Sequence, residues 1–68
     1  MLYLPKLAEI RKRFGVSQVI VAEAIGMTQQ QYQRYEIGKT ELPVRYLISL
    51  SKYYGISADL LLENAKEI

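Results

Sequence analysis

Four glycines divide this chain into short segments, and each follows a run of residues with helical periodicity. They are Gly15, Gly26, Gly38 and Gly55. Glycine commonly ends a helix because it adopts the left-handed backbone conformation without steric cost. The two prolines, Pro5 and Pro43, suit the first turn of a helix. The pattern therefore predicts five short helices joined by brief turns.

Apolar spacing and capping residues place these helices along the chain. The first has Leu7, Ile10 and Phe14 at helical spacing on its inner stripe, together with Arg11. The expected helices cover about residues 5–14, 18–25, 29–36, 43–54 and 58–62, and the N-cap residues of the second, third and fifth are Ser17, Thr28 and Ser57. No stretch alternates as a strand does, because residues 22–24 interrupt the β-branched run of residues 16–25.

The length of 68 residues suits one domain, so residues 1–68 are assigned to a single unit. A chain of this size buries only about 60% of its unfolded surface, and its core is small. We expect an all-α fold in which five helices form a compact domain. No apolar run approaches the roughly 20 residues of a membrane span, and no signal-peptide core is present. We therefore expect a cytoplasmic protein with no membrane partner.

The composition argues against enzymes and metal proteins. The chain has no cysteine and no histidine, which removes disulfides, thiolate nucleophiles, the commonest general base and the commonest transition-metal ligand. A paired-carboxylate site is the remaining option, but Asp59 and Glu63 form only a like-charged pair one helical turn apart. We predict no enzymatic activity, metal or cofactor, and no small-molecule substrate is identified.

The net charge of +2 is unevenly distributed. Residues 1–40 carry six Lys or Arg against three Glu, a net charge of +3, whereas residues 41–68 carry three against four acids, a net charge of −1. The positive excess coincides with a glutamine-rich segment, as a phosphate-facing surface requires. The alternative is an ordinary solvated surface.

That segment, residues 28–36, has four glutamines among the five residues that follow its capping threonine. At 100° per residue, Tyr32 and Tyr35 form an inward pair on the predicted helix, and with Tyr54 they are expected to line the core with their hydroxyls at its rim. An outward arc of amides and one guanidinium remains on the other side: Gln29, Gln30, Gln33 and Arg34. A glutamine amide pairs a donor with an acceptor and so matches the major-groove edge of adenine. The alternative is that these glutamines only keep the helix soluble.

The second and third segments are joined by a three-residue turn that contains Gly26, which predicts a helix-turn-helix. From Leu7 to Leu62 the chain resembles the phage-repressor and Cro-type (XRE) family, whose fold is lambda-repressor-like. The residues that carry the resemblance are Arg11, Gly15, Ser17, Gln18, Ala22, Gly26, Met27, Thr28, Tyr32, Tyr35, Glu36, Gly38, Lys39, Pro43, Leu47, Gly55, Ile56, Ser57, Leu61 and Leu62.

The resemblance implies a role for each matching position. Base contacts are expected from Thr28, Gln29, Gln30, Gln33 and Arg34. Contacts to the DNA backbone are expected from Gln18, Gln31, Gly38, Lys39 and Thr40, and Gln18 is also expected to brace Gln29. Arg11 and Glu36 match a partly buried ion pair, the alternative being two separate surface charges.

Some positions depart from the family pattern. Relatives often have Lys or Arg where this chain has Glu41, Leu42 and Val44, and a polar residue where it has Ile37. Fewer cations predict fewer phosphate contacts and a shallower dependence of binding on salt. Affinity is then expected to depend more on pairing of two subunits.

Two sets of residues suggest protein contacts. Leu60, Leu61 and Leu62 do not all fit on one inner face, and with residues 1–3 they suggest an apolar patch suited to homodimerisation. Tyr46 and Tyr53 share one helix face, as a partner surface or as rim packing. The leading interpretation is a sequence-specific regulator of transcription that binds double-stranded DNA, a repressor occupying its operator as a dimer. The alternative is a protein-interaction module, such as an antitoxin-like or anti-repressor protein.

Overall fold

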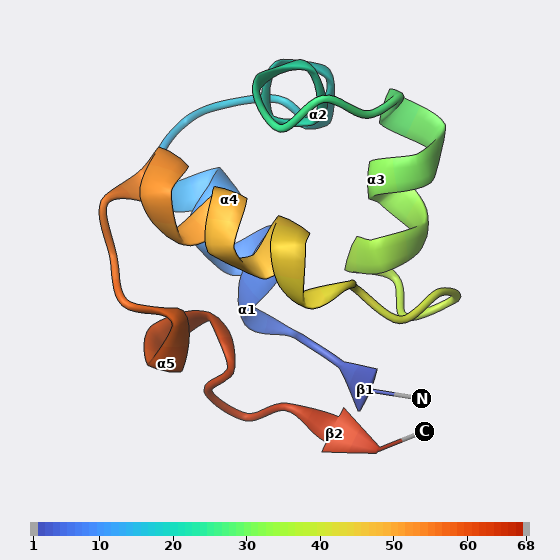
Figure 1. Ribbon diagram of the computed structural model, residues 1–68, viewed down its shortest axis with the longest axis vertical. Helices are drawn as coiled ribbons and strands as arrows, with labels where there is room; N and C mark the ends of the chain where they lie inside the picture. Colours follow the sequence, from blue (N-terminus) through green and yellow to red (C-terminus); the bar gives the residue numbers. More distant parts are fainter. Residues whose placement is uncertain (1, 68) are drawn as a thin grey trace.

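The structure, a computed structural model, describes residues 2–67. Its elements, in chain order, are β1 (Leu2–Tyr3), α1 (Lys6–Arg13), α2 (Gln18–Ala24), α3 (Gln29–Glu36), α4 (Val44–Tyr54), α5 (Ala58–Leu61) and β2 (Lys66–Glu67). In Figure 1, α4 lies at the centre with α1 behind it, while α3 and α5 flank it on opposite sides. The predicted set of five helices is confirmed over this part of the chain.

The helix ends follow the predicted capping pattern. Each N-cap hydroxyl accepts a hydrogen bond from the backbone N–H three residues on, in the pairs Ser17–Ile20 (3.2 Å), Thr28–Gln31 (3.2 Å) and Ser57–Leu60 (3.4 Å). A cap of this kind contributes about 0.5–2 kcal/mol to stability. Pro5 and Pro43 directly precede α1 and α4, one residue earlier than the first-turn positions expected.

The core draws on every helix. The largest fully buried side chains come one from each, in order Leu7, Val21, Tyr32, Leu50 and Leu61. Tyr35 and Tyr54 are also buried, so the three tyrosines expected to line the core do so. Such burial is the main source of stability in a chain without disulfides, since a buried Leu or Val side chain contributes about 1.5–3 kcal/mol.

The expectation that no strand forms is wrong. Residues 2–3 and 66–67 form a two-stranded antiparallel pair, with Leu2 opposite Glu67 and Tyr3 opposite Lys66. Two residues are too few to show the alternation that marks a strand in sequence. The pairing arises because the helices bring the two ends of the chain together, as Figure 1 shows.

Two apolar segments differ in part from expectation. Phe14 was assigned to the inner stripe of the first helix but is 51% exposed, because it follows the last turn of α1. Its ring packs on that of Tyr54, with 4.8 Å between the ring centroids.

In the expected dimer patch, Leu61 is fully buried and Leu60 is 41% exposed. Leu2 is partly covered within β1, and residue 1 lies outside the described residues. The patch is therefore smaller than its sequence suggests.

Candidate nucleic-acid interface

α2 and α3 pack against each other and are joined by a tight turn whose geometry depends on Gly26. This residue has φ +81°, in the left-handed region. Its N–H donates to the Glu23 carbonyl at 3.2 Å, and the Met27 N–H donates to the Ala22 carbonyl at 2.9 Å. These two bonds form a Schellman motif, which closes the end of α2. Thr28 then starts α3, so the predicted helix-turn-helix is formed.

α3 has one buried face and one exposed face. Tyr32, Tyr35 and Glu36 are the buried residues, with 0%, 6% and 5% exposure. The predicted base-contacting residues Thr28, Gln30, Gln33 and Arg34 are exposed, Gln29 is half-buried, and Gln31 is exposed as well. The structure therefore places the predicted amide and guanidinium arc at the surface, where it is open to a ligand.

The structure brings Arg11 and Glu36 together in one ion pair. The Arg11 Nε donates to Glu36 Oε2 at 2.6 Å, and a second guanidinium nitrogen donates to Oε1 at 3.3 Å. Both side chains are shielded, with 13% and 4% exposure. A third bond, from Arg11 to the Val16 carbonyl at 3.0 Å, fixes the guanidinium to the segment between α1 and α2.

Hydrogen bonding decides the charge state of Glu36. Burial alone would raise the pKa of this carboxyl, but hydrogen bonds from Arg11 and Gln18 outweigh it and hold the pKa below its usual value. The hydrogen bond to Glu36 likewise raises the pKa of Arg11. Both groups are therefore ionised at neutral pH.

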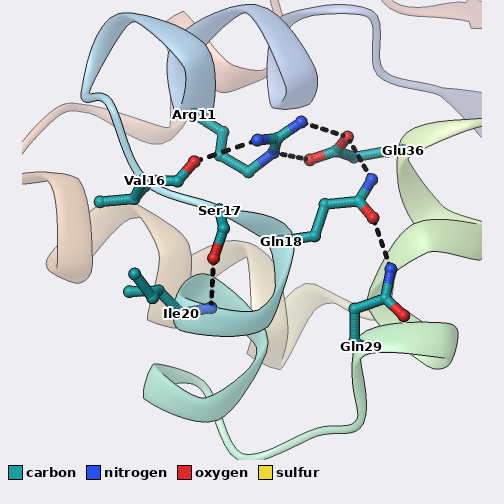
Figure 2. Close-up of polar contacts among 7 residues, drawn as sticks. All are labelled: Arg11, Val16, Ser17, Gln18, Ile20, Gln29 and Glu36. Carbon is teal, nitrogen blue, oxygen red and sulfur yellow. Dashed lines mark hydrogen bonds and ion pairs between the residues drawn. The ribbon is translucent and has the colours of Figure 1, made fainter.

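A chain of side-chain amides leads from this ion pair to the start of α3, as Figure 2 shows. The Gln18 Nε2 donates to Glu36 Oε1 at 3.0 Å, and the Gln29 Nε2 donates to Gln18 Oε1 at 2.7 Å. The bracing of Gln29 by Gln18 is thus present in the structure. Sequence reasoning missed the bond from Gln18 to Glu36, whose partners lie 18 positions apart.

The hydroxyl groups of Tyr32 and Tyr54 lie beneath this network. They were expected to reach the rim of the core, which is wrong, because both are buried and neither has a hydrogen-bond partner of standard geometry within residues 2–67. Burial raises the pKa of both groups, that of Tyr54 to about 12. The Tyr32 hydroxyl faces the Glu36 carboxylate, and this interaction raises its pKa further.

The loop after α3 holds the remaining predicted backbone contacts, and part of it is already engaged. The Gly38 N–H donates to the Tyr35 carbonyl at 3.3 Å, and the Lys39 N–H donates to the Arg34 carbonyl at 2.9 Å. Both N–H groups therefore close the end of α3 and are not free for a phosphate. The exposed Lys39 side chain and Thr40 remain open for that contact.

Three of the six Lys and Arg side chains in residues 1–40 are paired with carboxylates of the protein itself. Lys6 and Arg13 both form ion pairs with Glu9 at 3.1 Å, and Arg11 is committed to Glu36. Ile37 and Val44 are 51% and 69% exposed at positions where relatives often carry polar or basic groups. The positive charge available to phosphates is therefore smaller than the composition suggests.

Residues 2–67 contain neither a cluster suited to a metal ion nor a helix suited to a membrane. Between Leu2 and Glu67, no three His, Cys, Asp or Glu side chains lie where they could hold a metal ion. No helix of this part of the chain has the length and apolar character needed to cross a membrane. Neither finding adds a candidate site to the surface of α3.

The fold and the α2–α3 unit define a helix-turn-helix domain. A family model described as helix-turn-helix matches residues 7–61, which is most of the chain. The chain therefore belongs to this family, in its Cro/C1 (XRE) type, and the predicted family and lambda-repressor-like fold are confirmed. The family is one of HTH-type regulators and not of enzymes.

Curated relatives in Bacillus subtilis (strain 168) are similar over nearly the whole chain. The SPbeta prophage-derived uncharacterized HTH-type transcriptional regulator YonR is 41% identical over 58 residues, 85% of this chain and 54% of the relative. The uncharacterized HTH-type transcriptional regulators YobD and YqaE are 30% and 31% identical over 61 and 62 residues, covering 90% and 91% of this chain and 54% and 53% of the relatives. The chain thus spans about half the length of these relatives.

Proposed function

We propose that this domain recognises a specific sequence in double-stranded DNA through α3 and represses transcription by occupying an operator as a dimer. The observation that carries the proposal is the exposed arc of α3, where Gln30, Gln33 and Arg34 are open and Gln29 is held in place from α2. This arc has donors and acceptors but no carboxylate to repel phosphate. It is supported by the HTH-type regulators that the chain resembles.

The dimensions of α3 suit the major groove. An α-helix with its side chains is about 10–12 Å in diameter, and the major groove is about 12 Å wide. Gln29 and Gln30 would contact adenine edges, Arg34 would contact guanine or phosphate, and the Thr28 methyl group would contact a thymine methyl. Gln18, Gln31, Lys39 and Thr40 would position the domain on the backbone on either side.

An apolar groove supports pairing of two copies. It has a volume of about 530 Å³ and lies between β1 and the start of α4. Its lining comprises Leu2, Leu4, Glu41, Leu42, Pro43, Val44, Leu47 and Leu62. Val44, at its edge, is 69% exposed, and burial of such a side chain against a second copy is favourable. A two-fold dimer would place two α3 helices about 34–36 Å apart, one helical turn of DNA.

Selection of duplexes from a random pool, followed by titration in rising salt, tests the proposal. We expect one preferred sequence with two-fold symmetry. We also expect a shallow salt dependence, since each neutralised phosphate contributes a slope of only about −0.9 in log K against log salt. Equal affinity for selected and random duplexes at every salt concentration would overturn sequence-specific recognition.

The exposed apolar residues favour one second candidate, a protein-interaction module. Val44, Ile48 and Leu60 are 69%, 49% and 41% exposed, more than DNA binding requires. Purification of partners with and without nuclease distinguishes the two functions. A stoichiometric protein partner that survives nuclease treatment, together with no selected duplex, would favour the module.

A further inference from the structure

In the amide network between α1, α2 and α3, each hydrogen bond is donated toward Glu36, and Glu36 determines this direction. An ionised carboxylate accepts hydrogen bonds but has no hydrogen to donate. Arg11 holds Glu36 in this form by hydrogen bonds to both of its oxygens. Any amide that bonds to Glu36 must therefore turn its NH2 group toward it.

The orientation of the two glutamines follows from this constraint. Gln18 directs its NH2 group to Glu36 at 3.0 Å, which leaves its carbonyl oxygen facing α3. Gln29 must then direct its own NH2 group to that oxygen, which it does at 2.7 Å. In Figure 2 the Gln29 carbonyl oxygen points away from Gln18. Within residues 2–67, no group donates a hydrogen bond to it.

We propose that Glu36 is a positioning residue for base recognition, which fixes the amide orientation of Gln29 through Gln18 and thereby selects adenine over guanine. The inference rests on the proposed function, in which Gln29 contacts a base. Gln29 presents one acceptor and one remaining N–H, which match the amino group and N7 of adenine. Guanine offers two acceptors, O6 and N7, and the Gln29 carbonyl oxygen would face O6 without a hydrogen between them.

The opposite orientation of the Gln18 amide shows why the direction of these hydrogen bonds matters for base selection. If Gln18 presented its NH2 group to Gln29, the Gln29 carbonyl oxygen would be used inside the protein. Both N–H groups of Gln29 would then point outward, toward the two acceptors of guanine. That arrangement would require Gln18 to present its oxygen to Glu36, where two acceptors would meet. The buried charge excludes it.

Two variants and a control test the inference on DNA. Gln18→Met removes the amide link and leaves the Arg11–Glu36 pair intact, while Arg11→Met combined with Glu36→Gln replaces the charge by an amide that both donates and accepts. The measured quantity is the ratio of affinities for adenine and guanine at the base pair whose selectivity Gln29→Ala abolishes. We expect this ratio to fall about tenfold in both variants, because Gln29 is then free to turn its NH2 group toward the acceptors of guanine. Glu23→Gln removes an exposed carboxylate from α2 and should leave the ratio unchanged.

The ratio is insensitive to a uniform loss of affinity, so the expected phosphate contact of Gln18 does not affect it. Thermal unfolding shows which variants are folded, and Gln18→Met, which leaves the core intact, decides the result if the double variant unfolds. An unchanged ratio in folded Gln18→Met, with the preference lost in Gln29→Ala, would overturn the inference while the proposed function stands.

A measurement on the free protein separates the network from DNA binding. By NMR, one side-chain amide proton of Gln29 should exchange with water more slowly than the other, because only one is bonded to Gln18. Gln18→Met should remove the difference. Equal exchange in the wild-type protein would overturn the amide orientation, whereas unequal exchange without any preferred duplex would overturn the proposed function and, with it, the role in base selection.

Discussion

At the scale of single residues, Gln29 carries the most specific prediction. Its side chain is half-buried and braced by Gln18, so little rotamer entropy is lost on contact with a base. We expect Gln29→Ala to relax the preference at one base pair by roughly 1–3 kcal/mol and to leave other positions unchanged. Competition binding with duplexes substituted at single positions measures this. Equal weakening on every duplex would instead identify Gln29 as a backbone contact.

The burial of Arg11 predicts a large effect on stability. Arg11→Met leaves the Glu36 carboxylate buried and without its partner, which costs about 3–5 kcal/mol. So small a domain has little stability to spare. Arg13→Met is the matched control, because Arg13 is 75% exposed in its ion pair with Glu9 and such pairs contribute about 0–1 kcal/mol. Urea unfolding compares the two, and similar losses would contradict the buried pair.

The lowered pKa of Glu36 predicts loss of stability in acid. The folded-state pKa lies below the ordinary value of 4.5, so the folded protein releases this proton more readily than the unfolded chain. The contribution is therefore fully present above about pH 4.5 and is lost as the pH falls through the folded-state pKa. Unfolding free energies measured from pH 7 to pH 3 should converge for the wild-type protein and the variant with Arg11→Met and Glu36→Gln. A constant gap would contradict the assignment.

At the scale of elements, the turn between α2 and α3 depends on one backbone conformation. Gly26 and Gly55 both have positive φ, and an added Cβ would meet nothing within 4 Å at either. Alanine at each position therefore costs backbone strain alone, about 1–2 kcal/mol. We expect similar losses of stability from Gly26→Ala and Gly55→Ala, but weaker DNA binding only from Gly26→Ala, because only that turn orients α3. Equal weakening by both would contradict this role.

At this scale, the features that the sequence predicted are mostly those formed between residues close together in the chain. The starts of α2, α3 and α5 follow from Ser17, Thr28 and Ser57, whose hydroxyls bond within one turn. The strand pair was not predictable, because it depends on where the helices bring the chain ends. The same holds for the bond from Gln18 to Glu36 and for the buried tyrosine hydroxyls, which depend on how α1, α2 and α3 pack. Local chemistry thus predicted the five helices and the exposed arc, and tertiary packing determined the strand pair and how that arc is held.

At the scale of the whole molecule, the apolar groove at the start of α4 predicts how two copies pair. Val44 is 69% exposed beside this groove, so Val44→Glu should change the stability of the isolated domain by no more than about 0.5 kcal/mol. In a dimer the same carboxylate would be buried against a second copy without a partner, which is costly. We therefore expect Val44→Glu to abolish dimerisation in sedimentation experiments.

The effect on DNA follows from the symmetry of the complex. Loss of the dimer should reduce the affinity for a full two-fold operator at least tenfold more than the affinity for a single half-site, because a half-site needs only one α3, which is intact. Lys52→Gln changes the net charge by the same amount on the same helix, outside the residues that line the groove, and serves as the control. A wild-type protein that is monomeric on a full operator, or a Val44→Glu variant that still dimerises, would exclude this groove as the surface that pairs two copies.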